Sequence, residues 1–368
     1  MTAGGQRRHF LSWSVALIAA GLLPLREVSA LKTPETGATL VLELDLSTRT
    51  RDVGRAIQAG VRAALQSSSS TLPVLVIDTH GNTARALDAL TDYSRSAAIA
   101  AIIGGGDGNV SSAVAQWAKQ HQVPYGIVWA GNGQAQVDGH WSSAFSLSDE
   151  RAIALLIKEA QAYKKNRWGF LLSNDALGRA SYDVLLSLMS TTDSFELVSV
   201  QWHDVPANDI GAQYRRMEQQ GAQAIWLTGQ PRASRLLAEA MRPQLKHKKA
   251  IPVAASSNAW NAEFADKFKM IFANLPFYFA LPESNSMNPW MQGDSLLLRH
   301  PASAQAQALT LTLLSEIKKV SVDLKKQRSA ITGAWGALQV LQQTAPITIA
   351  HYGAQGQLEF APTARLFI

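Results

Sequence analysis

Residues 97–109 read AAIAAIIGGGDGN, an apolar run that ends in a glycine-rich turn. The run predicts a buried strand, and the residues after Asn109 have the apolar spacing of a helix as far as Val123 and Pro124. At the carboxyl end of a parallel strand, glycines allow close approach of a ligand, and the N–H groups of the next helix attract anions. The turn therefore predicts either a polar small-molecule site or a tight connection alone. It lacks the motif of a nucleotide P-loop and the glycine spacing of a dinucleotide fingerprint.

The same unit of strand and helix repeats on both sides of this stretch. Before it, we expect strands at 39–46 and 74–78 and helices at 53–66 and 83–95. After it, we expect strands at 125–129, 168–172, 196–201, 224–227 and 252–254, and helices at 152–163, 179–189, 210–219 and 233–241. This alternation with short loops predicts parallel sheets that are covered on both faces. Residues 282–301 have loop composition and no clear period.

Length and composition limit the class of protein. The 368 residues, 47% of them hydrophobic, suffice for two lobes, since one domain takes about 100–200 residues. The formal charge of +6 is too mild to argue for nucleic acid, and the basic run at 246–249 is best explained as a solvated helix end. The chain has no cysteine, which excludes disulfides and thiolate metal sites. Of its ten tryptophans, most belong to the core, and one or two are candidates for stacking on a ligand.

The first 30 residues predict export. Arg7 and Arg8 precede an apolar core of about 14 residues, and Val28, Ser29 and Ala30 form a small-residue cleavage site. The adjacent arginines resemble a twin-arginine signal, with an ordinary Sec signal as the alternative. The apolar core is shorter than the roughly 20 residues that span a bilayer. We therefore expect a periplasmic protein that does not span the membrane, cleaved near Ala30.

No motif for catalysis stands out. The sequence has no Gly-x-Ser-x-Gly elbow and no His-Glu-x-x-His helix, and its eight histidines show no metal-ligand spacing. Residues 315–318 fit Ser-x-x-Lys but lie within a predicted helix, without the companion motifs of that enzyme class. We expect no catalytic residues, no metal and no cofactor.

The order of motifs resembles the type 1 periplasmic binding proteins, especially the branched-chain amino-acid-binding branch. The features that carry the resemblance are Gly54 with Gly60, residues 103–104, 123–124 and 173–178, the helix segment at 333–337, and the turn and strand at 353–360. The resemblance implies an α/β fold of two doubly wound parallel-sheet lobes, joined by a hinge of three crossovers near residues 148, 280 and 347. The first lobe would comprise 31–147 plus about 280–346, and the second 148–279 plus about 347–368. The ligand would be held between the lobes by hinge closure.

The resemblance also implies ligand contacts at the loops that follow the strands. The predicted ligand-binding residues are Asp107, Gly108, Asn109, Ser111, Trp129, Gly131, Asp149, Asp175, Thr228, Gln230, Ser256, Ser257 and Asn258. Several have a structural alternative: Asp149 as a helix cap, and 228–230 and 256–258 as capping turns. Trp129 would be a flat wall where the family has a hydroxyl, and Trp260 is a second candidate wall. An arginine of the loop 47–51 is a weaker candidate for an anionic ligand.

The second lobe departs from the family pattern. The family places an acidic residue for the ligand ammonium after the strand at 252–254, but residues 255–258 read ASSN. A buried ammonium without a charged partner is costly, so an ordinary α-amino acid is a doubtful ligand. We expect a solute-binding protein of an ABC importer for a carboxylate, amide, amino-acid-like or aromatic acid ligand, with a membrane permease as partner. The alternatives are a ligand sensor for a membrane receptor or kinase, and a protein-docking activator similar to those of penicillin-binding proteins.

Overall fold

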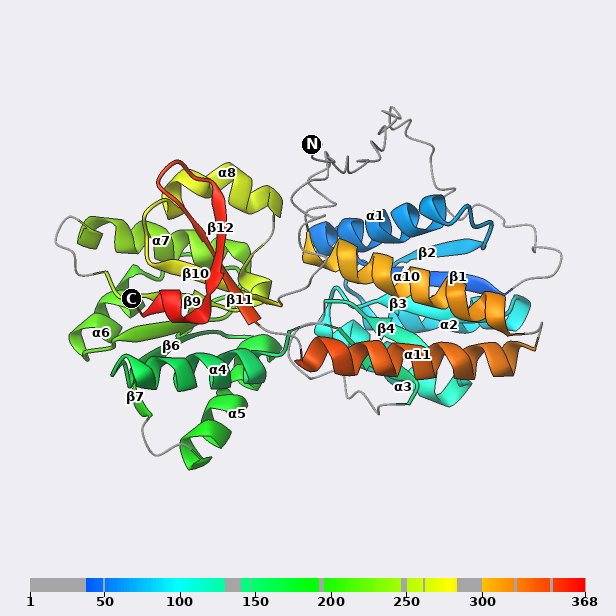
Figure 1. Ribbon diagram of the computed structural model, residues 1–368, viewed down its shortest axis with the longest axis horizontal. Coiled ribbons are helices and arrows are strands. Elements are labelled where there is room, and N and C mark those ends of the chain that lie inside the picture. The colour runs from blue at the N-terminus through cyan, green and yellow to red at the C-terminus, as the bar shows by residue number, and fades with distance from the viewer. Residues whose placement is uncertain are drawn as a thin grey trace, which may run out of the picture. The chain divides into compact units, whose positions relative to one another are not determined.

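The computed structural model describes residues 38–367, except for 49, 130–139, 146, 192–194, 246–249, 261, 283–299, 321–322 and 345–346. The predicted signal segment, Arg49, Gly131, the basic run at 246–249 and most of 282–301 lie outside the described residues. Within the described part, the chain forms the two parallel-sheet lobes that the sequence predicts (Figure 1).

The first lobe is built on a sheet of five parallel strands in the order β2-β1-β3-β4-β5. The strands are β1 (Thr39–Leu44), β2 (Val74–Asp78), β3 (Ile99–Gly104), β4 (Tyr125–Ile127) and β5 (Ser142–Ala144). The helices of this lobe are α1 (Arg51–Ser67), α2 (Thr83–Ser96), α3 (Gly108–His121), α10 (Pro301–Lys319) and α11 (Leu324–Thr344). The strand predicted at 125–129 ends at Ile127, so Trp129 lies in the loop that follows it.

Helices cover both faces of the first sheet, because successive strand residues point to opposite sides. Leu40 and Leu42 pack with α1, α10 and α11 in one buried cluster, which includes Trp335. Val41 packs with α2 and α3 in a second cluster on the other face. The two C-terminal helices α10 and α11 thus complete a lobe whose strands all come from the first 144 residues.

The second lobe is built on a sheet of seven strands in the order β12-β11-β10-β9-β8-β6-β7. The strands are β6 (Arg167–Ser173), β7 (Glu196–His203), β8 (Ala224–Leu227), β9 (Val253–Ala255), β10 (Phe277–Pro282), β11 (Ile347–Tyr352) and β12 (Leu358–Pro362). Strands β6 to β10 pair in parallel. Strands β11 and β12 pair antiparallel. The turn and strand expected at 353–360 overlap β12, whereas the antiparallel pairing was not predicted.

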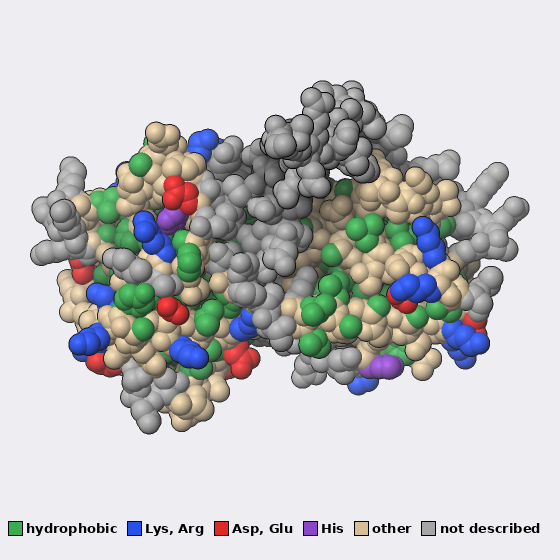
Figure 2. Space-filling view, viewed as in Figure 1, with side chains coloured by type: hydrophobic (Ala, Val, Ile, Leu, Met, Phe, Trp, Pro, Cys, Tyr) green, Lys and Arg blue, Asp and Glu red, His purple; other side chains and the backbone are tan. Residues whose placement is uncertain are grey.

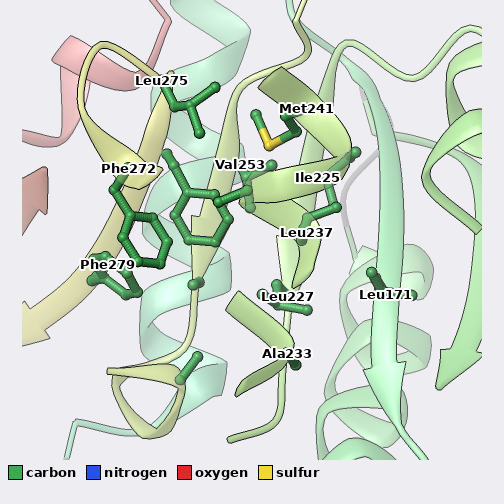
Figure 3. Close-up of a cluster of buried hydrophobic side chains, with 14 of the residues drawn as sticks. Leu171, Ile225, Leu227, Ala233, Leu237, Met241, Val253, Phe272, Leu275 and Phe279 are labelled. Atoms are coloured by element: carbon green, nitrogen blue, oxygen red, sulfur yellow. The ribbon is translucent and has the colours of Figure 1, made fainter. Parts of the chain in front are cut away.

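Helices cover both faces of this sheet as well. They are α4 (Asp149–Ala162), α5 (Ala176–Thr191), α6 (Gly211–Gln219), α7 (Pro231–Leu245) and α8 (Ala262–Phe272), with short 3₁₀ turns η1 (Ser257–Ala259) and η2 (Thr363–Leu366). Figure 3 shows the apolar cluster on one face, where Ile225 and Leu227 of β8 meet Leu237 and Met241 of α7. Trp226, between those two strand residues, belongs to the cluster with α4 and α5 on the opposite face.

The chain passes between the two lobes three times. The connections are residues 145–148 between β5 and α4, 283–300 between β10 and α10, and 345–346 between α11 and β11. They fall at the crossovers that the family resemblance implies, while the finer lobe boundaries stay predictions. Over the described residues, no helix is both long and apolar enough to cross a bilayer.

Candidate functional site

Asp107 caps α3 in the glycine-rich loop of the first lobe. Its carboxylate accepts hydrogen bonds from the backbone N–H of Asn109, at 3.0 Å, and of Val110, at 3.3 Å. The carboxylate thereby occupies two N–H groups that the sequence argument assigned to an anionic ligand. Ser111 is fully buried, and its hydroxyl donates to the carbonyl of Asp107 at 2.6 Å. Asp107 and Ser111 therefore shape the start of the helix.

Two glycines of this loop have different roles. Gly105 has a φ of +101°, and a Cβ on it would lie 2.8 Å from Cγ2 of Ile127 and 3.0 Å from the N of Val128. Only glycine fits there without strain. A Cβ on Gly108 would meet nothing within 4 Å. Gly108 and the exposed Asn109 thus leave free space beside the first turn of α3, although Asp107 occupies two of its N–H groups.

Glu43 lies next to the carboxyl end of β1, where it bonds to the glycine-rich loop. Its Oε2 accepts hydrogen bonds from the N–H of Gly105 at 3.2 Å and the hydroxyl of Tyr125 at 2.8 Å. The side chain is only 1% exposed. Burial raises the pKa of this carboxyl to about 8, the negative charges of Asp107 and Asp45 add to the rise, and the two hydrogen bonds oppose it. Glu43 is therefore predominantly protonated and neutral at pH 7.

Sequence reasoning missed Glu43 as part of this site. The sequence does contain a signal for it, because Glu43 is a lone acidic residue between Leu42 and Leu44 in an apolar strand. A carboxyl group stays buried at such a position only when it is neutral or well hydrogen-bonded.

Asp45 organises the neighbouring loop, at the end of β1. Its carboxylate accepts hydrogen bonds from the backbone N–H and the hydroxyl of both Thr48 and Thr50. Burial raises the pKa of Asp45, but these hydrogen bonds outweigh it and lower the pKa to about 2. The carboxylate thereby fixes the positions of Thr48 and Thr50 in the loop that follows β1. Arg51, a candidate for an anionic ligand, is largely exposed and lies 3.8 Å from Asp52.

Trp129 follows β4 and packs against His300, the residue that caps α10. Both side chains are 3% exposed, and their ring centroids are 5.0 Å apart in an edge-to-face arrangement. Trp260, which ends η1, is 5% exposed, and its ring centroid lies 6.2 Å from that of His300. The structure thus brings together both tryptophans that the sequence proposed as ligand walls. The sequence did not single out His300, which lies in the segment 282–301 that has loop composition.

Asp149 joins three segments of the second lobe. Its Oδ2 accepts from the hydroxyl of Ser181 at 2.6 Å, and its Oδ1 from the hydroxyl of Ser256 at 2.8 Å. Burial raises the pKa of Asp149 to about 6, while the two serine hydrogen bonds lower it. The prediction that Asp149 caps the helix is wrong by one residue. Ser148 is the cap, because its hydroxyl accepts from the N–H of Arg151.

Thr228 and Asp175 converge on Ser173 at the carboxyl ends of β6 and β8. Thr228 Oγ1 accepts from the N–H of Ser173 at 2.9 Å, and the hydroxyl of Ser173 donates to Asp175 at 2.7 Å. Asp175 also accepts from the N–H of Gly178 in the first turn of α5, at 3.1 Å. These side chains are bonded to the lobe itself, while Gln230, two residues after Thr228, is half-buried at the start of α7.

The turn after β9 contains the last group of predicted contacts. Ser257 is buried, and Ser256 donates to Asp149 as described above. Asn258 is half-buried, and its Nδ2 has no hydrogen-bond partner among the residues that the structure describes. The Nδ2 group of Asn258 is thus a buried side-chain donor that a ligand could pair.

Neither the surface charge nor the placement of metal-ligand side chains identifies a further site on the described residues. On the face in Figure 2, Lys and Arg side chains lie in small separated groups, several of them beside Asp or Glu side chains. Within the described ranges, no cluster of histidine and acidic side chains is arranged to hold a metal ion.

The two sheets, with polar and aromatic residues at the carboxyl ends of their strands, define a bilobal ligand-binding protein. A family model described as periplasmic binding protein matches residues 41–271, and the chain belongs to this family. No curated protein sequence matches the chain.

Solved structures agree with this assignment. A leucine-binding protein of Thermotoga maritima is 14% identical, with a TM-score of 0.69 over 88% of this chain and 98% of that one. A solute-binding protein of R. palustris in complex with 4-hydroxybenzoate is 12% identical, with a TM-score of 0.69 over 88% and 97%. A branched-chain amino acid transporter substrate-binding protein of Streptococcus pneumoniae in complex with isoleucine is 14% identical, with a TM-score of 0.68 over 88% and 98%. At these identities the likeness establishes the shared type 1 fold.

Proposed function

We propose that this protein is the periplasmic solute-binding component of an ABC importer, which captures a small polar ligand between its lobes by hinge closure. The observation that carries the proposal is the family match over residues 41–271, which includes every strand from β2 to β9. The family consists of proteins that bind ligands for transport. The predicted signal segment at residues 1–30 supports an exported, periplasmic location.

The bonding of the second lobe favours a ligand without a free ammonium group. The two carboxylates among the predicted contact residues of the second lobe, Asp149 and Asp175, each accept two hydrogen bonds from their own lobe. Redirecting either one to a ligand would leave buried donors unpaired, at a cost of about 1–3 kcal/mol each. We therefore propose a carboxylate, an amide or an aromatic acid as ligand rather than a simple α-amino acid.

Binding and release, without chemical conversion, account for the residues at this site. The polar side chains that bond to one another here are serines, threonines and carboxylates, and their hydrogen bonds fix loops and helix starts. A membrane permease with its ATPase would receive the ligand from the closed form.

The thermal midpoint of residues 31–368 tests this proposal, measured against a library of amino acids, amides, organic acids and aromatic acids. A ligand at about 100 times its dissociation constant adds roughly 2.7 kcal/mol of stability, which moves the midpoint by a few degrees. A shift with one chemical class supports the proposal and names the ligand class. No shift across the whole library contradicts it, and would direct the search to protein partners.

A further inference from the structure

We propose that His300 is a ligand-binding residue: its Nε2–H donates a hydrogen bond to an oxygen of the ligand, within an aromatic subsite that Trp129 and Trp260 form around it. The ligand class that fits is a planar aromatic compound with a carbonyl, carboxylate or hydroxyl oxygen. This inference rests on the proposed function and adds to it a residue and a ligand chemistry.

The tautomer of His300 follows from the cap that it forms on α10. Its Nδ1 accepts a hydrogen bond from the backbone N–H of Ala302 at 3.1 Å, so Nδ1 carries no proton. The proton of the neutral ring is therefore on Nε2. Nε2 has no hydrogen-bond partner within the part of the chain that the structure describes, although the side chain is only 3% exposed. Buried donors in proteins are nearly always paired, so this one calls for an acceptor.

The environment of His300 keeps the ring uncharged. Burial lowers the pKa of His300 to about 3, far below the pH of a bacterial exterior. Nε2 therefore offers one neutral N–H and no positive charge. Such a donor suits an uncharged or weakly charged oxygen and does not require a full anion.

The walls of this subsite are aromatic. The indole of Trp129 meets the His300 ring at 69°, and that of Trp260 lies at 42° to it. The Nε1 of Trp260 donates to the hydroxyl of Tyr352, so this indole contributes apolar surface and no free donor. Asn258, two residues before Trp260 in the sequence, also has an unpaired buried donor. Flat apolar walls with one imidazole donor match a planar ring that has an oxygen acceptor.

The experiment compares His300→Asn with wild type. Asparagine is a good helix cap, so the variant retains an acceptor for Ala302 N–H. It loses the longer-reaching Nε2 donor and the ring that packs between Trp129 and Trp260. His121→Asn is the matched control, because His121 also packs on a tryptophan of the first lobe, stacked on Trp117 at 4.0 Å. The probes are benzamide, benzoate, 4-hydroxybenzoate and isoleucine, titrated by calorimetry.

We expect an aromatic probe to bind wild type more tightly than isoleucine does. His300→Asn should weaken that binding roughly three- to tenfold, the effect of one neutral hydrogen bond, and His121→Asn should leave it unchanged. In wild-type protein labelled with ¹⁵N-histidine, the Nε2–H resonance of His300 should shift when the aromatic probe is added. This signal tests the contact even if the variant folds poorly.

Two results would overturn this inference while the proposed function stands. One is equal affinity of His300→Asn and wild type for the aromatic probe, together with an Nε2–H resonance that does not move. The other is binding of isoleucine with none of the aromatic probes. Failure of these probes and of the whole thermal library would instead overturn the proposed function, and this inference with it.

Discussion

Glu43→Gln should remove the part of the pH dependence of the unfolding free energy that comes from the buried, protonated carboxyl group of Glu43. The pKa of Glu43 rises from 4.5 to about 8 in the folded protein. Between these two values the folded state holds a proton that the unfolded state has lost. The stability that Glu43 contributes is therefore fully present below pH 4.5 and is lost as the pH rises toward 8.

The magnitude follows from the width of this window. Each pH unit within it costs the wild-type protein about 1.4 kcal/mol, so its free energy of unfolding should fall by about 4 kcal/mol from pH 5 to pH 8 through this group. Glutamine does not titrate, and its carbonyl oxygen can accept from the N–H of Gly105 and the hydroxyl of Tyr125 as Oε2 does. We expect the variant to differ little from wild type at pH 5 and to be more stable at pH 8.

Urea denaturation of both proteins at pH 5, 6.5 and 8 measures this difference. Asp92→Asn removes the same charge from an exposed ion pair with Arg95, and should change the unfolding free energy by less than about 1 kcal/mol. If the wild-type and Glu43→Gln stabilities run parallel from pH 5 to pH 8, Glu43 is not protonated in the fold and the reasoning fails.

Two further substitutions test the loops around the candidate site. Gly105→Ala should lower the free energy of unfolding by about 1–3 kcal/mol, because φ is +101° and the added Cβ would press on Ile127. Gly108→Ala should lower it by less than about 1 kcal/mol in the same urea experiment. Equal losses for the two variants would contradict the loop geometry. Asp149→Asn should abolish a loss of about 2 kcal/mol that wild type suffers as the pH rises from about 4 to 6, the window between the ordinary pKa of 3.8 and the raised one. Wild-type stability that does not fall over this window would show that Asp149 ionises freely.

The repeating pattern was enough to predict most of the fold. The strands β2 and β8 occupy the predicted residues 74–78 and 224–227, because apolar runs between turn residues leave little freedom in where a buried strand begins or ends. A strand near β12 was expected from the resemblance, but the antiparallel pairing of β11 and β12 was not predicted. The pairing of β11 with β10 depends on contacts between residues about 70 positions apart, which local periodicity does not encode.

The candidate site was less predictable than the fold. Asp107 directly before a helix is a standard cap signal, and reading it so would have shown that a carboxylate occupies the start of α3. The meeting of Trp129, Trp260 and His300 has no such signal, since it joins residues far apart in the sequence. Whether a polar group faces a ligand or its own lobe depends on side-chain pairing, as Asp149 with its two serines demonstrates.

Calorimetric titration of residues 31–368 with the compound that raises the thermal midpoint most tests the central claim most directly. If the protein captures a solute in one site built from its two lobes, the heat should saturate at about one ligand per chain. Heat that does not saturate, or the lack of any heat with every compound that shifts the midpoint, would contradict the account.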